Sequence, residues 1–199
     1  MTDERWYDVL GTPDRPTLGL DTFGDVPHSD PGFHARVLRE VVAEAVLADR
    51  LGVDYIGLGE HHRPDFAISA PDVVLAAIAG QTERIRLGTG VTVLSSDDPV
   101  RVYERFATLA AVSGGRAEVQ LGRGSFTESF RLFGFALEDY ETLFAEKLDL
   151  FAALQSEGPV TWSGSMRAPL HDQRVYPPTE LGRVPAWIGV GGTPESVVR

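Results

Sequence analysis

The chain has 199 residues, of which 18 are lysine or arginine and 29 are aspartate or glutamate, so its formal net charge is −11. This acidic balance argues against a nucleic-acid partner and against binding to an anionic membrane surface, because both favour basic patches. The chain has no cysteine, which excludes disulfides, thiolate metal sites and cysteine nucleophiles. It has no apolar run of the roughly 20 residues that a membrane span needs and no secretory signal at residues 1–5. We therefore expect a cytoplasmic, soluble protein.

Strand-like and helix-like segments alternate along the chain. After a short candidate strand at Thr17–Leu20, apolar residues at helical spacing predict a helix over Ala35–Leu51. The apolar run Val53–Leu58 predicts a strand that is buried on both faces. The same plan then recurs, with predicted strands at Ile85–Leu94 and Arg116–Leu121 and predicted helices at Val73–Ala79, Val100–Val112 and Leu137–Leu154.

The spacing of the strands predicts a barrel-type α/β fold. The strands at Val53–Leu58, Ile85–Leu94 and Arg116–Leu121 follow one another at intervals of one βα unit, as right-handed crossovers require. With the candidate strand at Thr17–Leu20 and a further strand at Val184–Val190 the count is five, whereas an eight-stranded barrel typically needs about 250 residues. We expect a TIM-type (β/α)8 barrel with only about the first five βα units present, as a single domain over residues 1–199 that is incomplete at its C-terminus. Residues 158–180 should form an inserted hairpin, with strands at Val160–Gly164 and Arg174–Tyr176.

One loop that follows a predicted strand carries titratable residues. Glu60, His61 and His62 come directly after Val53–Leu58, in the kind of position where parallel α/β folds hold their functional sites. A carboxylate and two imidazoles can donate or accept protons near neutral pH. They could instead cap a helix, or bind a metal with Asp65 as the third ligand, although no His-Glu-x-x-His helix is present. We favour an organic active site with no metal.

Two other loops are suited to an anion. Arg123 lies between two glycines, and its planar guanidinium matches phosphate oxygens. Gly191, Gly192 and Thr193 stand at a predicted helix start, where backbone N–H groups favour anions. Each loop alone could be an ordinary turn, but together they predict a phosphate site.

Glycines on the strand between these loops predict a flat ligand or a bulge. Gly88 and Gly90 lie two positions apart, which lets a planar group approach the backbone. No Gly-x-Gly-x-x-Gly segment opens a helix after a strand, and no Walker motif is present. A Rossmann dinucleotide site and a P-loop are therefore not supported.

Several motifs, taken in order, resemble those of the bacterial luciferase-like flavin monooxygenases. The resemblance runs from about Leu18 to Arg199, and it is the ordered set that is specific. In the luciferases themselves a reactive cysteine precedes the arginine, where this chain has Gly122, so bioluminescence is not implied. The matching segments are Glu60–His62, Ile85–Gly90, Asp98–Arg101, Gly114–Arg116, Gly122–Gly124, Phe130–Gly134, Pro185–Ile188 and Gly191–Ser196.

The resemblance implies a barrel that binds reduced flavin mononucleotide (FMN) at its C-terminal mouth and uses oxygen to oxidise a small organic substrate. His61 matches the catalytic histidine of the family, with Glu60 beside it as a carboxylate of the flavin pocket. Gly90 and Val91 fall where the family often has a non-proline cis peptide under the isoalloxazine. The two anion-type loops match the phosphate contacts.

The resemblance leaves two alternatives and suggests partners. Related barrels use the deazaflavin F420 for hydride transfer without oxygen, and the second alternative is a non-catalytic flavin-binding remnant of a barrel. The expected partners are a flavin reductase and a second copy of the chain in a homodimer. An incomplete barrel would leave Val184–Val190 with a bare edge, so we expect the gene to continue past Arg199 or the chain to associate with another copy.

Overall fold

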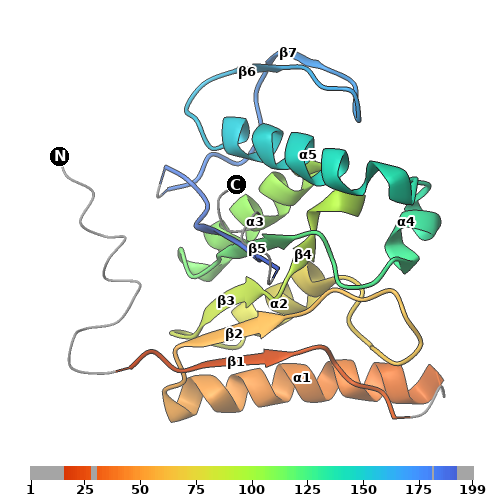
Figure 1. Cartoon of the computed structure of the whole chain (residues 1–199). Helices are drawn as coiled ribbons and strands as arrows, with labels where there is room; N and C mark the ends of the chain where they lie inside the picture. Colours follow the sequence, from red (N-terminus) through yellow and green to blue (C-terminus); the bar gives the residue numbers. More distant parts are fainter. Residues whose placement is uncertain (1–15, 28–30, 181, 192–199) are drawn as a thin grey trace.

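The structure is a computed structural model that describes residues 16–27, 31–180 and 182–191 (Figure 1). It contains two parallel sheets whose strands follow chain order. One sheet consists of β1 (Gly19–Thr22), β2 (Tyr55–Leu58) and β3 (Arg86–Thr89), and the other of β4 (Thr92–Val93), β5 (Val119–Gly122) and β8 (Ala186–Ile188).

An isolated parallel bridge between Leu87 of β3 and Ala117 joins the two sheets. The strand order therefore runs from β1 to β8 without reversing about its first strand, unlike a doubly wound sheet. This arrangement agrees with the predicted barrel-type α/β class, while the number of βα units in the whole barrel stays a prediction.

The helices alternate with the strands and pack against one another in chain order, α1 on α2, α2 on α3 and α3 on α5. Figure 1 shows α1 beside β1 at the bottom of the view, and α5 near the top, beneath β6 (Val160–Trp162) and β7 (Leu170–Gln173). None of the helices in the described ranges is long and apolar enough to cross a membrane. The helices are α1 (Pro31–Leu51), α2 (Pro71–Ala79), α3 (Pro99–Ser113), α4 (Glu128–Phe133) and α5 (Tyr140–Leu154), with short 3-10 helices η3 (Leu94–Ser96) and η4 (Leu137–Asp139).

The core lies between the sheets and these helices. Ile56 and Leu58 of β2 are almost fully buried, and Gly57 between them is buried too, as the apolar run predicted. Ile56 and Leu58 belong to one cluster with Leu75 of α2, Phe106 of α3 and Phe151 of α5. This packing fixes the strands, and the strands fix the loops at their carboxyl ends.

Helix α3 (Pro99–Ser113) extends one residue beyond the predicted Val100–Val112 at each end, and local residues account for both ends. The Asp98 side chain accepts hydrogen bonds from the backbone N–H of Val100 (3.0 Å) and Arg101 (3.3 Å), with Pro99 in the first turn. At the other end Gly114 has a φ of 68°, a left-handed conformation that glycine adopts without strain.

Three predicted elements differ from the structure. The strand predicted over Ile85–Leu94 is two strands, β3 and β4, in different sheets. Residues 137–139 of the predicted helix form η4, so α5 begins at Tyr140. The second strand of the predicted hairpin is β7 (Leu170–Gln173), which pairs with β6 (Val160–Trp162), instead of Arg174–Tyr176. Val175, which lies within that predicted range, packs against the core.

A buried lysine joins α5 to the β4–α3 connection. Lys147 is 3% exposed, and its Nζ donates to the carbonyl oxygen of Ser95 at 2.6 Å. The ammonium also lies 4.0 Å from the ring centre of Phe135. Burial lowers the pKa of Lys147 to about 8, even though the charges of Asp97 and Asp98 raise it.

We predict that the free energy of unfolding rises between about pH 8 and pH 10. In this window the unfolded chain keeps a proton on Lys147 that the folded protein releases, so the cost of burying the ammonium disappears as the pH rises. Above about pH 10 the raised pKa values of Tyr55 and Tyr103, both caused by burial, reverse the slope. Urea unfolding across this range should show the rise, and Lys147→Met should remove it. An equal slope in the variant would contradict the assignment.

Candidate functional site

Four loops with predicted site residues follow the carboxyl ends of β2, β3, β5 and β8. These strands are parallel, so their carboxyl ends lie on one edge of the fold, where α/β proteins bind ligands. In the loop after β8 the structure places Gly191, which is exposed. Gly192 and Thr193 lie outside the described residues, so their predicted role stays a prediction.

The His61 imidazole lies among three phenylalanine rings from three parts of the chain. Its ring centre is 5.0 Å from Phe23, 4.4 Å from Phe66 and 5.2 Å from Phe126. The backbone N–H of His61 donates to the carbonyl oxygen of Ile68 at 2.9 Å, which anchors the loop. Burial lowers the pKa of His61, an effect larger than the opposing effect of nearby carboxylates. The neutral imidazole therefore dominates at pH 7, and it can accept a proton.

Glu60 has different neighbours from His61, although the two are adjacent in sequence. One carboxylate oxygen, Oε1, lies 3.0 Å from Nε2 of His62, and the other, Oε2, accepts a hydrogen bond from the backbone N–H of Val93 at 2.9 Å. The side chains of Glu60 and His62 are only 10% and 11% exposed. Both oxygens of this carboxylate therefore already have partners.

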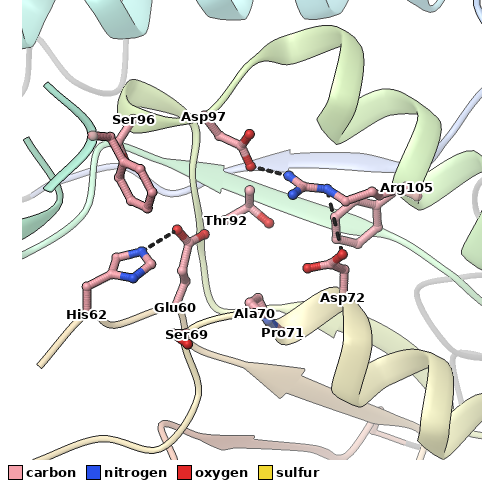
Figure 2. A pocket seen from close by; sticks show the side chains of 12 residues that line it. Glu60, His62, Ser69, Ala70, Pro71, Asp72, Thr92, Ser96, Asp97 and Arg105 are labelled. Atoms are coloured by element: carbon pink, nitrogen blue, oxygen red, sulfur yellow. Dashed lines mark hydrogen bonds and ion pairs between the residues drawn. The ribbon is translucent and has the colours of Figure 1, made fainter. Parts of the chain in front are cut away.

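Glu60 and His62 line a polar cavity of about 180 Å³ (Figure 2). Across the cavity Arg105 forms ion pairs with Asp97 and with Asp72, the latter at 3.7 Å. Other polar groups in the wall are Ser69, Thr92 and Ser96. The carboxylates of Glu60, Asp72 and Asp97 in the wall thus each have a cationic or imidazole partner, whereas the buried Nε of Arg105 makes no hydrogen bond.

A salt-bridge network behind His61 was not anticipated from the sequence. Arg63 donates to Asp65 at 3.0 Å and to Glu128 of α4 at 2.5 Å, and its guanidinium lies 4.5 Å from the ring centre of Phe126. The network ties the loop after β2 to the loop after β5. Asp65, considered above as a metal ligand, is engaged by this arginine. Within the described ranges no group of three His, Asp or Glu side chains is placed to hold a metal ion.

The peptide bond between Gly90 and Val91 is cis, as the resemblance implied. The backbone N–H of Gly90 donates to the carbonyl oxygen of Leu58, so this segment lies beside the end of β2. The Asp21 carboxylate of β1 lies so close to Gly57 and Gly90 that a Cβ atom on either would clash with it. Loss of hydration raises the pKa of Asp21. The short, exposed strand that carries Asp21 has no motif from which this contact could be predicted.

Arg123 has the features of an anion-binding residue. Its side chain is 13% exposed, its Nη2 is 3.6 Å from a carboxylate oxygen of Glu141, and its guanidinium lies 4.5 Å from the ring centre of Phe144. Its Nε is buried without a hydrogen-bond partner. Since a buried donor without a partner costs free energy, an anion such as a phosphate group would satisfy this nitrogen.

Comparison with known proteins shows similarity to monooxygenases in both sequence and structure. The chain is 36% identical over 115 residues to 4-hydroxyprotoasukamycin monooxygenase of Streptomyces nodosus subsp. asukaensis, over 57% of this chain and 31% of that protein. The crystal structure of monooxygenase RslO1 from Streptomyces bottropensis has a TM-score of 0.82 at 25% identity, over 90% of this chain and 55% of that one.

A more distant structure shares the fold. The FMN complex of the oxygenating constituent of 3,6-diketocamphane monooxygenase, from a Pseudomonas putida plasmid, has a TM-score of 0.75 at 18% identity, over 86% of this chain and 50% of that one. The chain spans about half the length, or less, of the curated relatives that it matches. Residues 22–199 match the family described as luciferase-like monooxygenase. Since this match extends over most of the sequence, the chain belongs to the luciferase-like monooxygenase family.

Proposed function

We propose that this chain binds FMN and takes part in a monooxygenase reaction in which reduced flavin and oxygen oxidise a small organic substrate. The observation that carries the proposal is the buried Nε of Arg123, which has no partner and lies on the edge of the fold that also holds His61. The first group supports phosphate binding, and the second supports proton transfer.

Each part of the site then has a task. Arg123 holds the phosphate, assisted by the backbone of Gly191, Gly192 and Thr193, and the Gly90–Val91 backbone supports the ring system. The bound reduced flavin supplies the electrons with which oxygen is activated. The chain supplies the binding groups, the orientation and a proton acceptor near the reacting atoms.

His61 is the proposed catalytic residue. Its imidazole is neutral because burial lowers its pKa, so it can take a proton and return it during one turnover. The rings of Phe23, Phe66 and Phe126 contact the imidazole and reduce its hydration, while Phe23 and Phe126 remain 40% and 38% exposed themselves. A small organic substrate would bind against these rings, which favour contact with an apolar part of the substrate over a polar part.

Partners follow from the same proposal. The related protein described as an oxygenating constituent supports a separate flavin reductase that delivers reduced flavin. A homodimer and a cytoplasmic location are proposed from the sequence.

Cofactor choice gives the direct test. We expect that binding to the purified protein perturbs the visible absorption of FMN and quenches the flavin fluorescence. Riboflavin should bind more weakly because it lacks the phosphate, and F420 should bind least. Mixing the complex of reduced FMN with oxygen and following flavin oxidation separates an enzyme from a flavin-binding remnant. Tighter binding of F420 than of FMN would favour the hydride-transfer alternative, and binding of neither would refute the proposal.

A further inference from the structure

The two halves of the candidate site belong to different hydrogen-bonded sheets. His61 follows β2 in the first sheet, and Arg123 follows β5 in the second. Backbone hydrogen bonds join the sheets at Leu87, whose N–H donates to the carbonyl oxygen of Arg116 and whose carbonyl oxygen accepts from the N–H of Glu118. The chain itself also passes from β3 to β4 through Gly90 and Val91. The hydrogen bonds at Leu87 lie near the amino end of β5, far along the strands from the edge that carries the site.

Toward the carboxyl edge, side chains link the two sheets. Thr89 of β3 exchanges hydrogen bonds with the backbone of Gln120, at 3.1 Å and 3.2 Å. Beyond Thr89, the Oε2 atom of Glu60 accepts the backbone N–H of Val93 at 2.9 Å. Glu60 comes directly after β2 in the sequence, whereas Val93 lies in β4 of the second sheet. This carboxylate therefore spans the boundary between the sheets next to the candidate site.

We propose that Glu60 is a positioning residue, which together with the Arg63–Glu128 ion pair described above holds the loop of His61 and the loop of Arg123 in a fixed relation, and that His62 orients its carboxylate. Val93 pairs with Gly122 in the β4–β5 ladder, and Gly122 is the neighbour of Arg123. The loop of His61 is thus connected to the loop of Arg123 through one side-chain hydrogen bond and the pairing of β4 with β5. The flavin-related part of this inference rests on the proposed function, whereas the coupling of the sheets does not.

The burial of the link makes it effective. Hydrogen bonds from a backbone N–H to an ionised carboxylate are stronger than those between neutral groups, and loss of the acceptor would leave a buried donor without a partner. On the other side, His62 contacts the Glu60 carboxylate (Figure 2) and stands edge-on to Phe133 of α4, with ring centres 4.9 Å apart. The carboxylate is held from two directions. This differs from the expected direct role of Glu60 in the flavin pocket.

Amide hydrogen exchange of the protein without flavin tests the coupling. In Glu60→Ala the Val93 amide should exchange about tenfold faster or more, because its acceptor is lost. Glu60→Gln keeps an acceptor oxygen at the same reach and should restore most of the protection. His62→Ala removes only the orienting contact, and should give a smaller acceleration. Unchanged exchange of Val93 in Glu60→Ala would overturn the proposal; should that variant not fold, unchanged exchange in His62→Ala overturns it.

Asp49 offers a matched control. It is a buried carboxylate that accepts the backbone N–H groups of Arg84 (2.9 Å) and Ile85 (2.7 Å), at the opposite ends of the strands. Asp49→Asn should lower the overall stability without selectively accelerating exchange at Val93. A selective acceleration in this control would mean that any loss of stability exposes β4, and it would overturn the specific role of Glu60.

Flavin binding supplies the readout that a purely structural role would not change. With FMN bound, Glu60→Ala should broaden and shift the visible absorption band of the flavin, and Glu60→Gln should restore the wild-type band. An unaltered band in Glu60→Ala would overturn the positioning role. If wild-type protein binds no FMN, the proposed function fails, but the exchange rates of Val93 still decide the coupling of the two sheets.

Discussion

Replacing His61 with alanine is expected to lower the rate of substrate oxidation by about 10²–10⁴-fold, the usual contribution of a general acid–base residue. The affinity for oxidised FMN should change little, because the proposed task of the imidazole is proton transfer and not binding. The measurement is turnover with reduced FMN, oxygen and substrate, alongside a fluorescence titration with oxidised FMN. His171→Ala is a matched control, since that histidine is exposed on β7, outside the four loops of the site.

The pH profile separates catalysis from a structural role. Because burial lowers the pKa of His61, the neutral imidazole should persist below the ordinary histidine pKa of about 6.5, and activity should fall only in more acidic solution. In His61→Ala the residual activity should lose this acidic limb. A variant with wild-type turnover, or one that keeps the same acidic limb, would show that His61 does not move the proton.

The sequence predicts the fold well where local signals agree with burial. The apolar run of β2 and the Asp98 cap of α3 are such signals, and both elements form as expected. The division of Ile85–Leu94 into two strands could not be predicted in this way. It depends on which residues pair with β2 and which pair with β5, and these partners are distant in the sequence.

The sequence predicted where the site lies, but not that Glu60 and His61 have separate contacts within it. Glu60 and His61 are adjacent and both titratable, so sequence reasoning assigned them to one pocket. Their contacts are separate: the carboxylate meets His62 and Val93, whereas the imidazole meets three phenylalanine rings. Two of those rings, Phe23 and Phe126, come from loops with no periodic pattern. Side-chain direction in such loops is set by tertiary packing, which a single sequence does not encode in local form.

Replacing Arg123 with alanine should weaken FMN binding by about 1–3 kcal/mol, roughly 5–150-fold in the dissociation constant, because a charge-assisted hydrogen bond to the phosphate is lost. The ion pair between Arg123 and Glu141 competes little with the phosphate, since its N–O distance is long, at 3.6 Å, and the Glu141 side chain is 59% exposed. Riboflavin has no phosphate, so its affinity should be nearly the same in the wild type and the variant. Titrations of both ligands, followed by flavin fluorescence, give the comparison.

The comparison of FMN with riboflavin also controls for damage to the fold. Arg123 packs on Phe144, so its removal could disturb the β5 loop, and such a disturbance would weaken both ligands alike. Arg131→Ala controls for net charge, because it removes the same charge from an exposed position on α4. We expect Arg131→Ala to leave both affinities within about twofold of wild type, since screening at ordinary salt weakens the effect of an exposed charge. Equal losses for FMN and riboflavin in Arg123→Ala would assign this arginine to the structure of the loop and would move the phosphate site elsewhere on this edge of the fold.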